Sequence, residues 1–231
     1  MPDKYETVIG LEVHSQLLTT SKMFCPCGSD YQDSEPNTRV CPVCMGMPGV
    51  LPVVNKKAVD LVIKTGLALN CSISPETKFD RKNYPYPDLM KGYQISQFDI
   101  PIALSGNLAI QVGDAEERQI GITRVHLEED VAKLIHRKEP YGDSYSLLDI
   151  NRAGVPLMEI VSEPDIRSAD EAGLYISKIR SILMYLDTCD GNMQEGSLRA
   201  DVNISVRKPG EDYGIRCEIK NLNSCLLYTS D

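Results

Sequence analysis

Side chains that could bind a metal ion or a phosphate recur at alternate positions in segments with the pattern of β-strands. Glu12 and His14 lie two residues apart within residues 7–17. Residues two apart on a strand emerge on the same face, about 7 Å from each other, so both can reach one divalent ion. The same spacing recurs in two later segments, at Arg199 and Asp201 and at Glu218 and Lys220.

A carboxylate inside an apolar strand is a further signal. Glu159 interrupts the apolar run 155–161. Burying its carboxylate there costs free energy unless a partner or a metal compensates the negative charge. Residues 126–130 (His-Leu-Glu-Glu-Asp) add carboxylates at the end of another strand. Carboxylates, a histidine and a few Arg and Lys groups suit Mg²⁺ and nucleotide phosphates. For any single pair the alternative is a polar strand face turned to water.

The sequence lacks the glycine-rich phosphate and dinucleotide loops and the Gly-x-Ser-x-Gly motif. Any nucleotide site must therefore rest on a metal bound at the face of a sheet.

Four of the eight cysteines form two closely spaced pairs, Cys25-x-Cys27 and Cys41-x-x-Cys44, with thirteen residues between them. Four thiolates converging on one ion from two turns, at about 2.3 Å, make a tetrahedral zinc site. Proline and glycine residues around both pairs favour such turns. We predict structural zinc here; four unrelated buried thiols are the alternative. The next three cysteines are predicted to be small core residues: Cys71, Cys189 and Cys217.

Residues 79–101 have an unusual composition, with charged residues and tyrosines around Pro85 and Pro87. The prolines predict an extended, non-helical surface segment. It is either a solvated turn or a binding loop, and composition does not separate the two.

The overall composition is that of a globular protein with one or two domains. The chain has 231 residues, of which 42% are hydrophobic and 25% charged, which excludes a disordered chain, a collagen and a coiled coil. A net charge of −9 disfavours broad nucleic-acid binding but not a local tRNA contact. The first residues do not resemble a signal peptide, and the longest apolar stretch is too short to span a membrane. With cysteines expected to stay reduced, we predict a cytoplasmic protein without membrane contact.

Strand-like and helix-like segments are interleaved along the chain. Helices are predicted at 55–69, capped by Asn55 and with Leu67 in its apolar stripe, and at 168–186, opened by a capping box. Strands are predicted at 7–17, 107–112, 119–127, 145–150, 155–161, 197–206 and 215–221. Strands without regular intervening helices predict an α+β fold, with a mixed or antiparallel sheet and helices on one face.

Several long segments, in order, resemble one protein family, the B subunits of aspartyl/glutamyl-tRNA(Asn/Gln) amidotransferases. They are residues 6–14, 79–84, 86–88, 92–97, 126–130, 151–156, 159–165, 195–199 and 218–224. The resemblance covers nearly the whole chain, from about residue 5 to residue 224.

This resemblance implies a ligase that forms a carbon–nitrogen bond with glutamine as amido donor. ATP and Mg²⁺ would serve to phosphorylate the side-chain carboxylate of Glu-tRNA(Gln) or Asp-tRNA(Asn). Ammonia, released from glutamine by the amidase, which is the A subunit, would then displace phosphate, which leaves far more readily than hydroxide. A small C subunit is the other implied partner. The implied fold is similar to that of glutamine synthetase, an antiparallel cradle with flanking helices.

Roles follow from position in the matching segments. The implied Mg²⁺ ligands are Glu12, His14, Glu129 and Glu159. Among the implied catalytic groups, Glu128, Asp201 and Glu218 support those ligands or a second ion. Arg199 and Lys220 neutralise phosphate, and Lys82 is the remaining implied catalytic residue. The groups implied to contact the tRNA acceptor end or the ammonia path are Arg81, Tyr84 and Tyr86, beside Lys82. The four clustered cysteines match the zinc-bearing members of the family.

Two departures from the family pattern shape the predicted domains. Members of the family continue well past residue 231 into a helical region and a tail domain that recognise the tRNA body, and residues 225–231 do not continue the pattern. We predict a truncated catalytic cradle at 1–224 with a zinc-knuckle insertion at 23–47, followed by a non-matching, artefactual tail. An isolated fragment of this kind can be inactive.

Two alternatives stay open at this point. One is a non-catalytic, zinc-stabilised assembly or tRNA-docking module of the same complex. The other is the archaeal, glutamate-specific E subunit, which usually carries an inserted domain that is not seen here. The sequence does not distinguish Glu-tRNA from Asp-tRNA as substrate.

Overall fold

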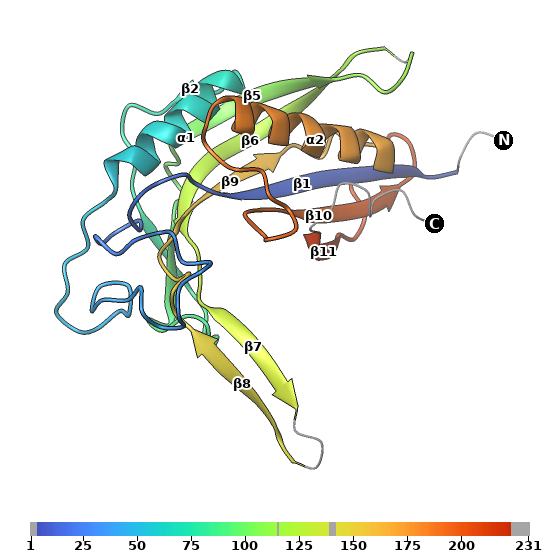
Figure 1. Cartoon of the computed structure of the whole chain (residues 1–231). Helices are drawn as coiled ribbons and strands as arrows, with labels where there is room; N and C mark the ends of the chain where they lie inside the picture. Colours follow the sequence, from blue (N-terminus) through green and yellow to red (C-terminus); the bar gives the residue numbers. More distant parts are fainter. Residues whose placement is uncertain (1–3, 115, 139–141, 223–231) are drawn as a thin grey trace.

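Strand β1 (Glu6–Gln16) lies in the middle of a seven-stranded sheet in the computed structural model, which describes residues 4–114, 116–138 and 142–222. The order across the sheet is β11-β10-β1-β9-β6-β5-β2 (Figure 1). The other strands of the sheet are β2 (Ser72–Ile73), β5 (Ala103–Ile110), β6 (Arg118–Glu129), β9 (Pro156–Ser162), β10 (Leu198–Arg207) and β11 (Cys217–Leu222). All strand pairings among the described residues are antiparallel, which confirms the α+β class.

Two helices, α1 (Lys56–Ala68) and α2 (Ala169–Tyr185), lie on the same face of this sheet (Figure 1). α1 packs on β5 and β6, and α2 packs on β1 and β5. Both predicted helix starts are confirmed. The Asn55 side chain accepts hydrogen bonds from the first turn of α1, and the Ser168 hydroxyl accepts from the backbone N–H of Glu171.

One predicted core residue of α1 was wrong. Leu67 is 61% exposed, and the buried face of the helix includes Leu61, Val62 and Gly66. A Cβ on Gly66 would lie 2.7 Å from the Cβ of Ala103, so glycine lets α1 approach β5 closely on that side. Leu67, the next residue along the helix, lies off this contact and faces solvent.

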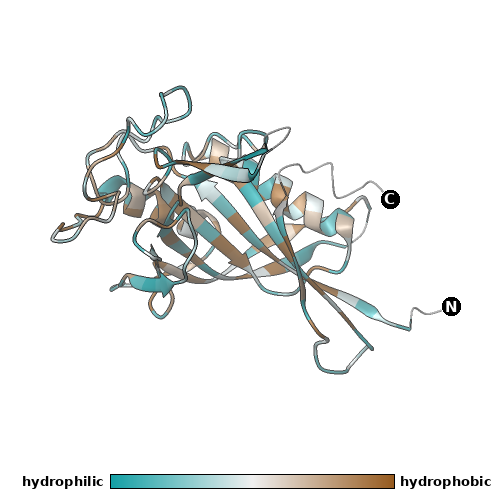
Figure 2. Cartoon of the chain, turned by 90° about the horizontal axis from the view of Figure 1, so that it is seen from below, coloured by the Kyte–Doolittle hydropathy of each residue, from teal (hydrophilic) through white to brown (hydrophobic). Residues whose placement is uncertain are grey.

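The hydrophobic core fills the space between the helices and the sheet. In β10, Leu198, Ala200 and Val202 are buried in it, whereas the alternating residues are only partly buried. Brown and teal residues accordingly alternate along the strands in Figure 2. The sheet face without helices is therefore rich in polar side chains.

Two hairpins stand outside the main sheet. β3 (Asp80–Asn83) pairs with β4 (Tyr93–Ser96), and β7 (Lys133–Lys138) pairs with β8 (Ser144–Asp149). The β7–β8 hairpin projects away from the body (Figure 1). The prediction that residues 79–101 are extended and non-helical is confirmed, but the segment contains a β-hairpin that the sequence analysis did not identify.

Between β1 and α1 the chain forms turns, with an isolated bridge between Ser21 and Gly28, and these turns carry the four clustered cysteines. Cys71 and Cys189 are buried as predicted, but Cys217 is exposed, so its prediction as a core residue was wrong. No described helix is long and apolar enough to cross a membrane. The predicted domain end at residue 224 and the tail 225–231 lie outside the described residues.

Candidate functional site

A cleft of about 720 Å³ is lined by the polar side of the sheet and by the β3–β4 hairpin. Strands β1, β6, β9, β10 and β11 all contribute lining residues. Because these strands come from distant parts of the sequence, the fold gathers many of the predicted site residues in one place.

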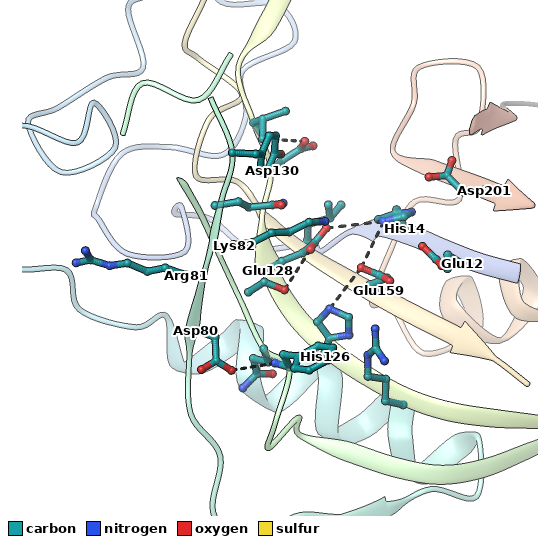
Figure 3. A pocket seen from close by; sticks show the side chains of 18 of the residues that line it. Glu12, His14, Asp80, Arg81, Lys82, His126, Glu128, Asp130, Glu159 and Asp201 are labelled. Atoms are coloured by element: carbon teal, nitrogen blue, oxygen red, sulfur yellow. Dashed lines mark hydrogen bonds and ion pairs between the residues drawn. The ribbon is translucent and has the colours of Figure 1, made fainter. Parts of the chain in front are cut away.

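Glu159 lies at the centre of this cleft, between two histidines. Strand register places it opposite His14 of β1 on one side and opposite His126 of β6 on the other. Its Oε2 atom is 3.5 Å from Nε2 of His14 and 3.4 Å from Nε2 of His126. Glu128 Oε1 lies 3.8 Å from the same nitrogen of His14 (Figure 3). One ligand atom from each of His14, Glu128 and Glu159 lies within 4.8 Å of the others, close enough for a single cation.

The protonation of this group follows from burial and mutual charge. Burial raises the pKa of Glu128, and the charge of Glu159 raises it further. Burial alone would raise the pKa of Glu159 too, but hydrogen bonds from His126 and His14 hold it well below its usual range. Burial would lower the pKa of His14, but Glu159 and Glu128 outweigh this effect and raise it. The protonation states of His14, Glu128 and Glu159 therefore depend on one another.

A second group of carboxylates lies beside the first, toward the edge of the sheet. Glu12, Asp201 and Glu218 also offer ligand atoms within 4.8 Å of one another. Glu12 is paired in register with Asp201, and its Oε1 accepts a hydrogen bond from Nδ2 of Asn203 at 2.9 Å. The ammonium of Lys220 lies 3.2 Å from Glu218.

Cationic side chains surround both groups. Lys82, Arg199 and Lys220 line the cleft, and Lys82 reaches toward Glu128 and His14 in Figure 3. Arg199 Nη2 is 3.6 Å from Oδ1 of the buried Asp130. Arg81 also borders the cleft, but it points away from the central group, and its guanidinium carbon lies 4.4 Å from the centre of the Tyr93 ring.

The structure separates Glu129 from the residues with which it was expected to bind Mg²⁺. Its carboxylate forms an ion pair with Lys91 and accepts the backbone N–H of Ile95 at 3.0 Å, and it does not line the cleft. The reason is local, because neighbouring residues on a strand point to opposite faces. Glu128, the preceding residue, occupies the position beside His14.

The two tyrosines of the predicted binding segment differ. Tyr84 lines the cleft. Burial raises its pKa to about 12, and the negative charge of Asp88 contributes to the increase. Tyr86 is 58% exposed and does not line the cleft.

Three residues of the site were given no role by the sequence analysis: His126, Arg124 and Asp130. His126 and Arg124 share the cleft face of β6 with Glu128, and two-residue spacing from Glu128 could have identified them. Asp130 accepts a hydrogen bond from Gln16 at 2.7 Å and lies beside Arg152 and Arg199. Only the folded structure reveals that position.

The four cysteines predicted to bind zinc do come together, with their sulfurs within 4.8 Å of one another. Cys41 and Cys44 Sγ atoms are 4.0 Å apart. Sulfurs on a tetrahedral zinc are ~3.8 Å apart, given Zn–S bonds of about 2.3 Å. A hydrogen bond from Cys25, aided by the nearby charge of Lys22, lowers the pKa of Cys44 to about 4. The cluster could thus hold a metal ion.

The chain that forms this fold and cleft belongs to a known family of catalytic domains. Residues 7–228 match the family model described as the GatB/GatE catalytic domain, and the chain belongs to this family. This match extends to residue 228, beyond residue 224, at which the resemblance was predicted to end.

Relatives named as the B subunit of aspartyl/glutamyl-tRNA(Asn/Gln) amidotransferase align with 222 residues, or 96%, of the chain. The protein of Dehalococcoides mccartyi (strain CBDB1) is 62% identical, and those of Thermodesulfovibrio yellowstonii and Moorella thermoacetica are each 60% identical. The aligned part is 45–46% of these relatives, so the chain spans about half their length. The predicted family resemblance is confirmed.

Proposed function

We propose that this chain is the carboxylate-activating part of a tRNA-dependent amidotransferase. The γ-phosphoryl group of ATP is transferred to the side-chain carboxylate of Glu-tRNA(Gln) or Asp-tRNA(Asn), giving an acyl phosphate and ADP. Ammonia then attacks the acyl carbon, the bond to phosphate breaks, and amide, phosphate and a proton are released. The relatives' name, which includes both tRNAs, supports this substrate class.

The observation that carries the proposal is the juxtaposition of two ligand groups with cationic side chains in one cleft. His14, Glu128 and Glu159 would hold one Mg²⁺, and Glu12, Asp201 and Glu218 a second. Mg²⁺ bound there supplies positive charge that stabilises the transferring phosphoryl group. The mixture of carboxylates and one histidine is compatible with such an ion, whereas Cys ligands would favour a softer metal.

The chain's own residues position and neutralise the reacting groups. Arg199, oriented by Asp130, and Lys220 lie where they can bind phosphate oxygens. Lys82 extends from the β3–β4 hairpin toward the central group, where it can contact the substrate carboxylate or the incoming ammonia. The buried histidine His126 orients the Glu159 carboxylate.

The remaining expectations extend this proposal to the whole protein. The curved antiparallel sheet supports a glutamine synthetase-like cradle, and the cysteine cluster supports a structural zinc. The relatives are named as one subunit of an amidotransferase, which supports a multisubunit complex. We propose that this complex is cytoplasmic and contains the amidase (the A subunit) and the small C subunit. A non-catalytic assembly or tRNA-docking module is disfavoured, because such a module needs no buried Glu159 between two histidines.

The test uses the variants His14→Ala and Glu159→Gln in the full-length protein assembled in its complex. Both should lose most ATP cleavage that depends on misacylated tRNA, because phosphoryl charge is then poorly neutralised. Basal glutamine hydrolysis, carried out by another subunit, should persist and report correct assembly. Glu76→Gln, at an exposed position outside the cleft, is the control. Near-normal ATP cleavage in both cleft variants would favour the docking module.

A further inference from the structure

An exposed aromatic ring lies at the rim of the cleft, and nothing in the reaction described above uses it. Phe98 lines the cleft yet remains 72% exposed. It follows β4, in the connection to β5. A large aromatic side chain at the opening of a polar cleft is a candidate contact for a flat ligand.

The backbone that carries Phe98 is firmly held. Its N–H donates to Oδ2 of Asp80 at 3.1 Å, and Asp80 is itself paired with Lys78 at 3.0 Å. The preceding residue, Gln97, is buried; its amide donates to Thr77 and accepts the backbone N–H of Leu127 at 3.0 Å. The ring is therefore presented from a fixed backbone, which lowers the entropic cost of stacking a ligand against it.

Arg124 of β6 lies beside this ring. Its guanidinium carbon is 5.8 Å from the ring centre of Phe98. Its Nε atom is buried and has no hydrogen-bond partner among the described residues. A guanidinium beside an aromatic ring can stack on a base while it donates to ribose or phosphate oxygens. No hydrogen bond through Nε to the described residues therefore fixes this guanidinium in place.

The position of this pair relative to the ligand groups is informative. Arg124 precedes His126 by two residues on β6, on the same face, so the pair adjoins the central group. Glu12, Asp201 and Glu218 lie on β1, β10 and β11, on the other side of β9. The central group thus lies between an aromatic end and a carboxylate-rich end of the same cleft.

We propose that Phe98 and Arg124 form a stacking subsite for an adenine nucleotide. The base lies against the open face of Phe98, and Arg124 donates to the ribose or phosphate oxygens. This inference rests on the proposed function, in which both ATP and the 3′-terminal adenosine of tRNA carry adenine. We favour the terminal adenosine, because the pair adjoins the central group, where the aminoacyl carboxylate would be activated, and the carboxylate-rich end stays open to the ATP phosphates.

The experiment uses Phe98→Ala and Arg124→Gln in the full-length protein within its complex. KM is measured separately for ATP and for misacylated tRNA. In addition, the Kd of an uncharged RNA minihelix ending in CCA is measured, because it does not depend on catalysis. Base–aromatic stacking contributes enough that Phe98→Ala should raise the tRNA KM and the minihelix Kd roughly 5- to 150-fold. Phe98→Tyr should restore both, and Leu51→Ala, an exposed apolar residue outside the cleft, should change neither.

The outcomes separate the possible sources of the base. A rise in the ATP KM alone assigns the stacked base to ATP and keeps the subsite. Unchanged KM and Kd values for both ligands in folded Phe98→Ala and Arg124→Gln proteins would overturn it. The proposed phosphoryl transfer is tested separately: intact ATP cleavage in His14→Ala would contradict it. The minihelix Kd does not depend on that result, so it still tests the stacking subsite.

Discussion

His14 and Glu159 lie opposite each other on neighbouring strands β1 and β9, with Nε2 and Oε2 3.5 Å apart. This cross-strand pair explains why a carboxylate occurs in an otherwise apolar strand. Strand β9 is buried along most of its length, and the charge of Glu159 is compensated by His14 and His126 rather than by water. The pair also sets the position of the candidate metal site.

Neighbouring carboxylates on β6 provide a matched test of that site. Glu128→Gln should raise the Mg²⁺ concentration needed for half-maximal ATP cleavage by at least roughly tenfold, because a candidate ligand is lost. Glu129→Gln should leave this concentration unchanged, because Glu129 faces away and pairs with Lys91. The measurement is a Mg²⁺ titration of the full complex. If Glu129→Gln raised this Mg²⁺ concentration as much as Glu128→Gln does, Glu129 would have to be a ligand after all.

The cysteine cluster should contain one zinc ion per chain when the protein is purified without chelator. Four sulfurs within 4.8 Å of one another give the geometry for it. Cys41→Ser should lower the zinc content measured by metal analysis, and a chelator should lower the melting temperature of the unmodified protein. Cys217→Ser, an exposed cysteine outside the cluster, is the matched control. Zinc content near zero, or equal in Cys41→Ser and the unmodified protein, would contradict the assignment.

Lys82→Ala should impair amide formation more than ATP cleavage. Lys82 reaches the central group from the β3–β4 hairpin rather than from the sheet strands that carry the phosphate-binding candidates. Both rates are measured in the complete complex, with Lys57→Ala on the exposed side of α1 as control. Equal losses of the two rates would place Lys82 at the transferred phosphate instead.

Two ion pairs of Glu6, with Arg167 and Arg207, lie outside the cleft lining and should make stability depend on pH. Hydrogen bonds from Arg207 and Arg167 lower the pKa of Glu6 below its ordinary value of 4.5. The folded state therefore favours the charged form, and the stabilisation is present above pH 4.5 and is lost as pH falls through the lowered pKa.

Glu6→Gln should accordingly be less stable than the unmodified protein at neutral pH, and the difference should shrink in acid. Urea unfolding of both proteins across this pH range measures it. A difference that stays constant with pH would show that the charge of Glu6 does not contribute.

The sequence predicted the elements that have one buried and one exposed face. Alternation identified β1 and β10 because their apolar residues enter the core while their polar residues face the cleft. Strand β8 was predicted at residues 145–150, but its partner β7 and the β3–β4 hairpin were not, because they show no regular apolar alternation.

The ligand sets were predictable only within single strands. The pairing of Glu12 with His14 follows from two-residue spacing, but the contact between Glu159 and His126 depends on the register of β6 against β9. The choice between Glu128 and Glu129 is local, because neighbouring residues on a strand point to opposite faces, and Glu128 shares its face with His126. Long-range register follows from packing of the whole sheet, which a local pattern does not reveal.

The strand order of the sheet has a consequence for how the protein folds. Central strand β1 is synthesised long before its two neighbours, β9 and β10, which lie much later in the chain. Pairing over such long sequence separations is entropically costly and slow. On the ribosome β1 must therefore wait as an unpaired strand until β9 and β10 emerge. The cleft should assemble among the last steps, and a nascent chain that stops before β9 would lack the group of His14, Glu128 and Glu159.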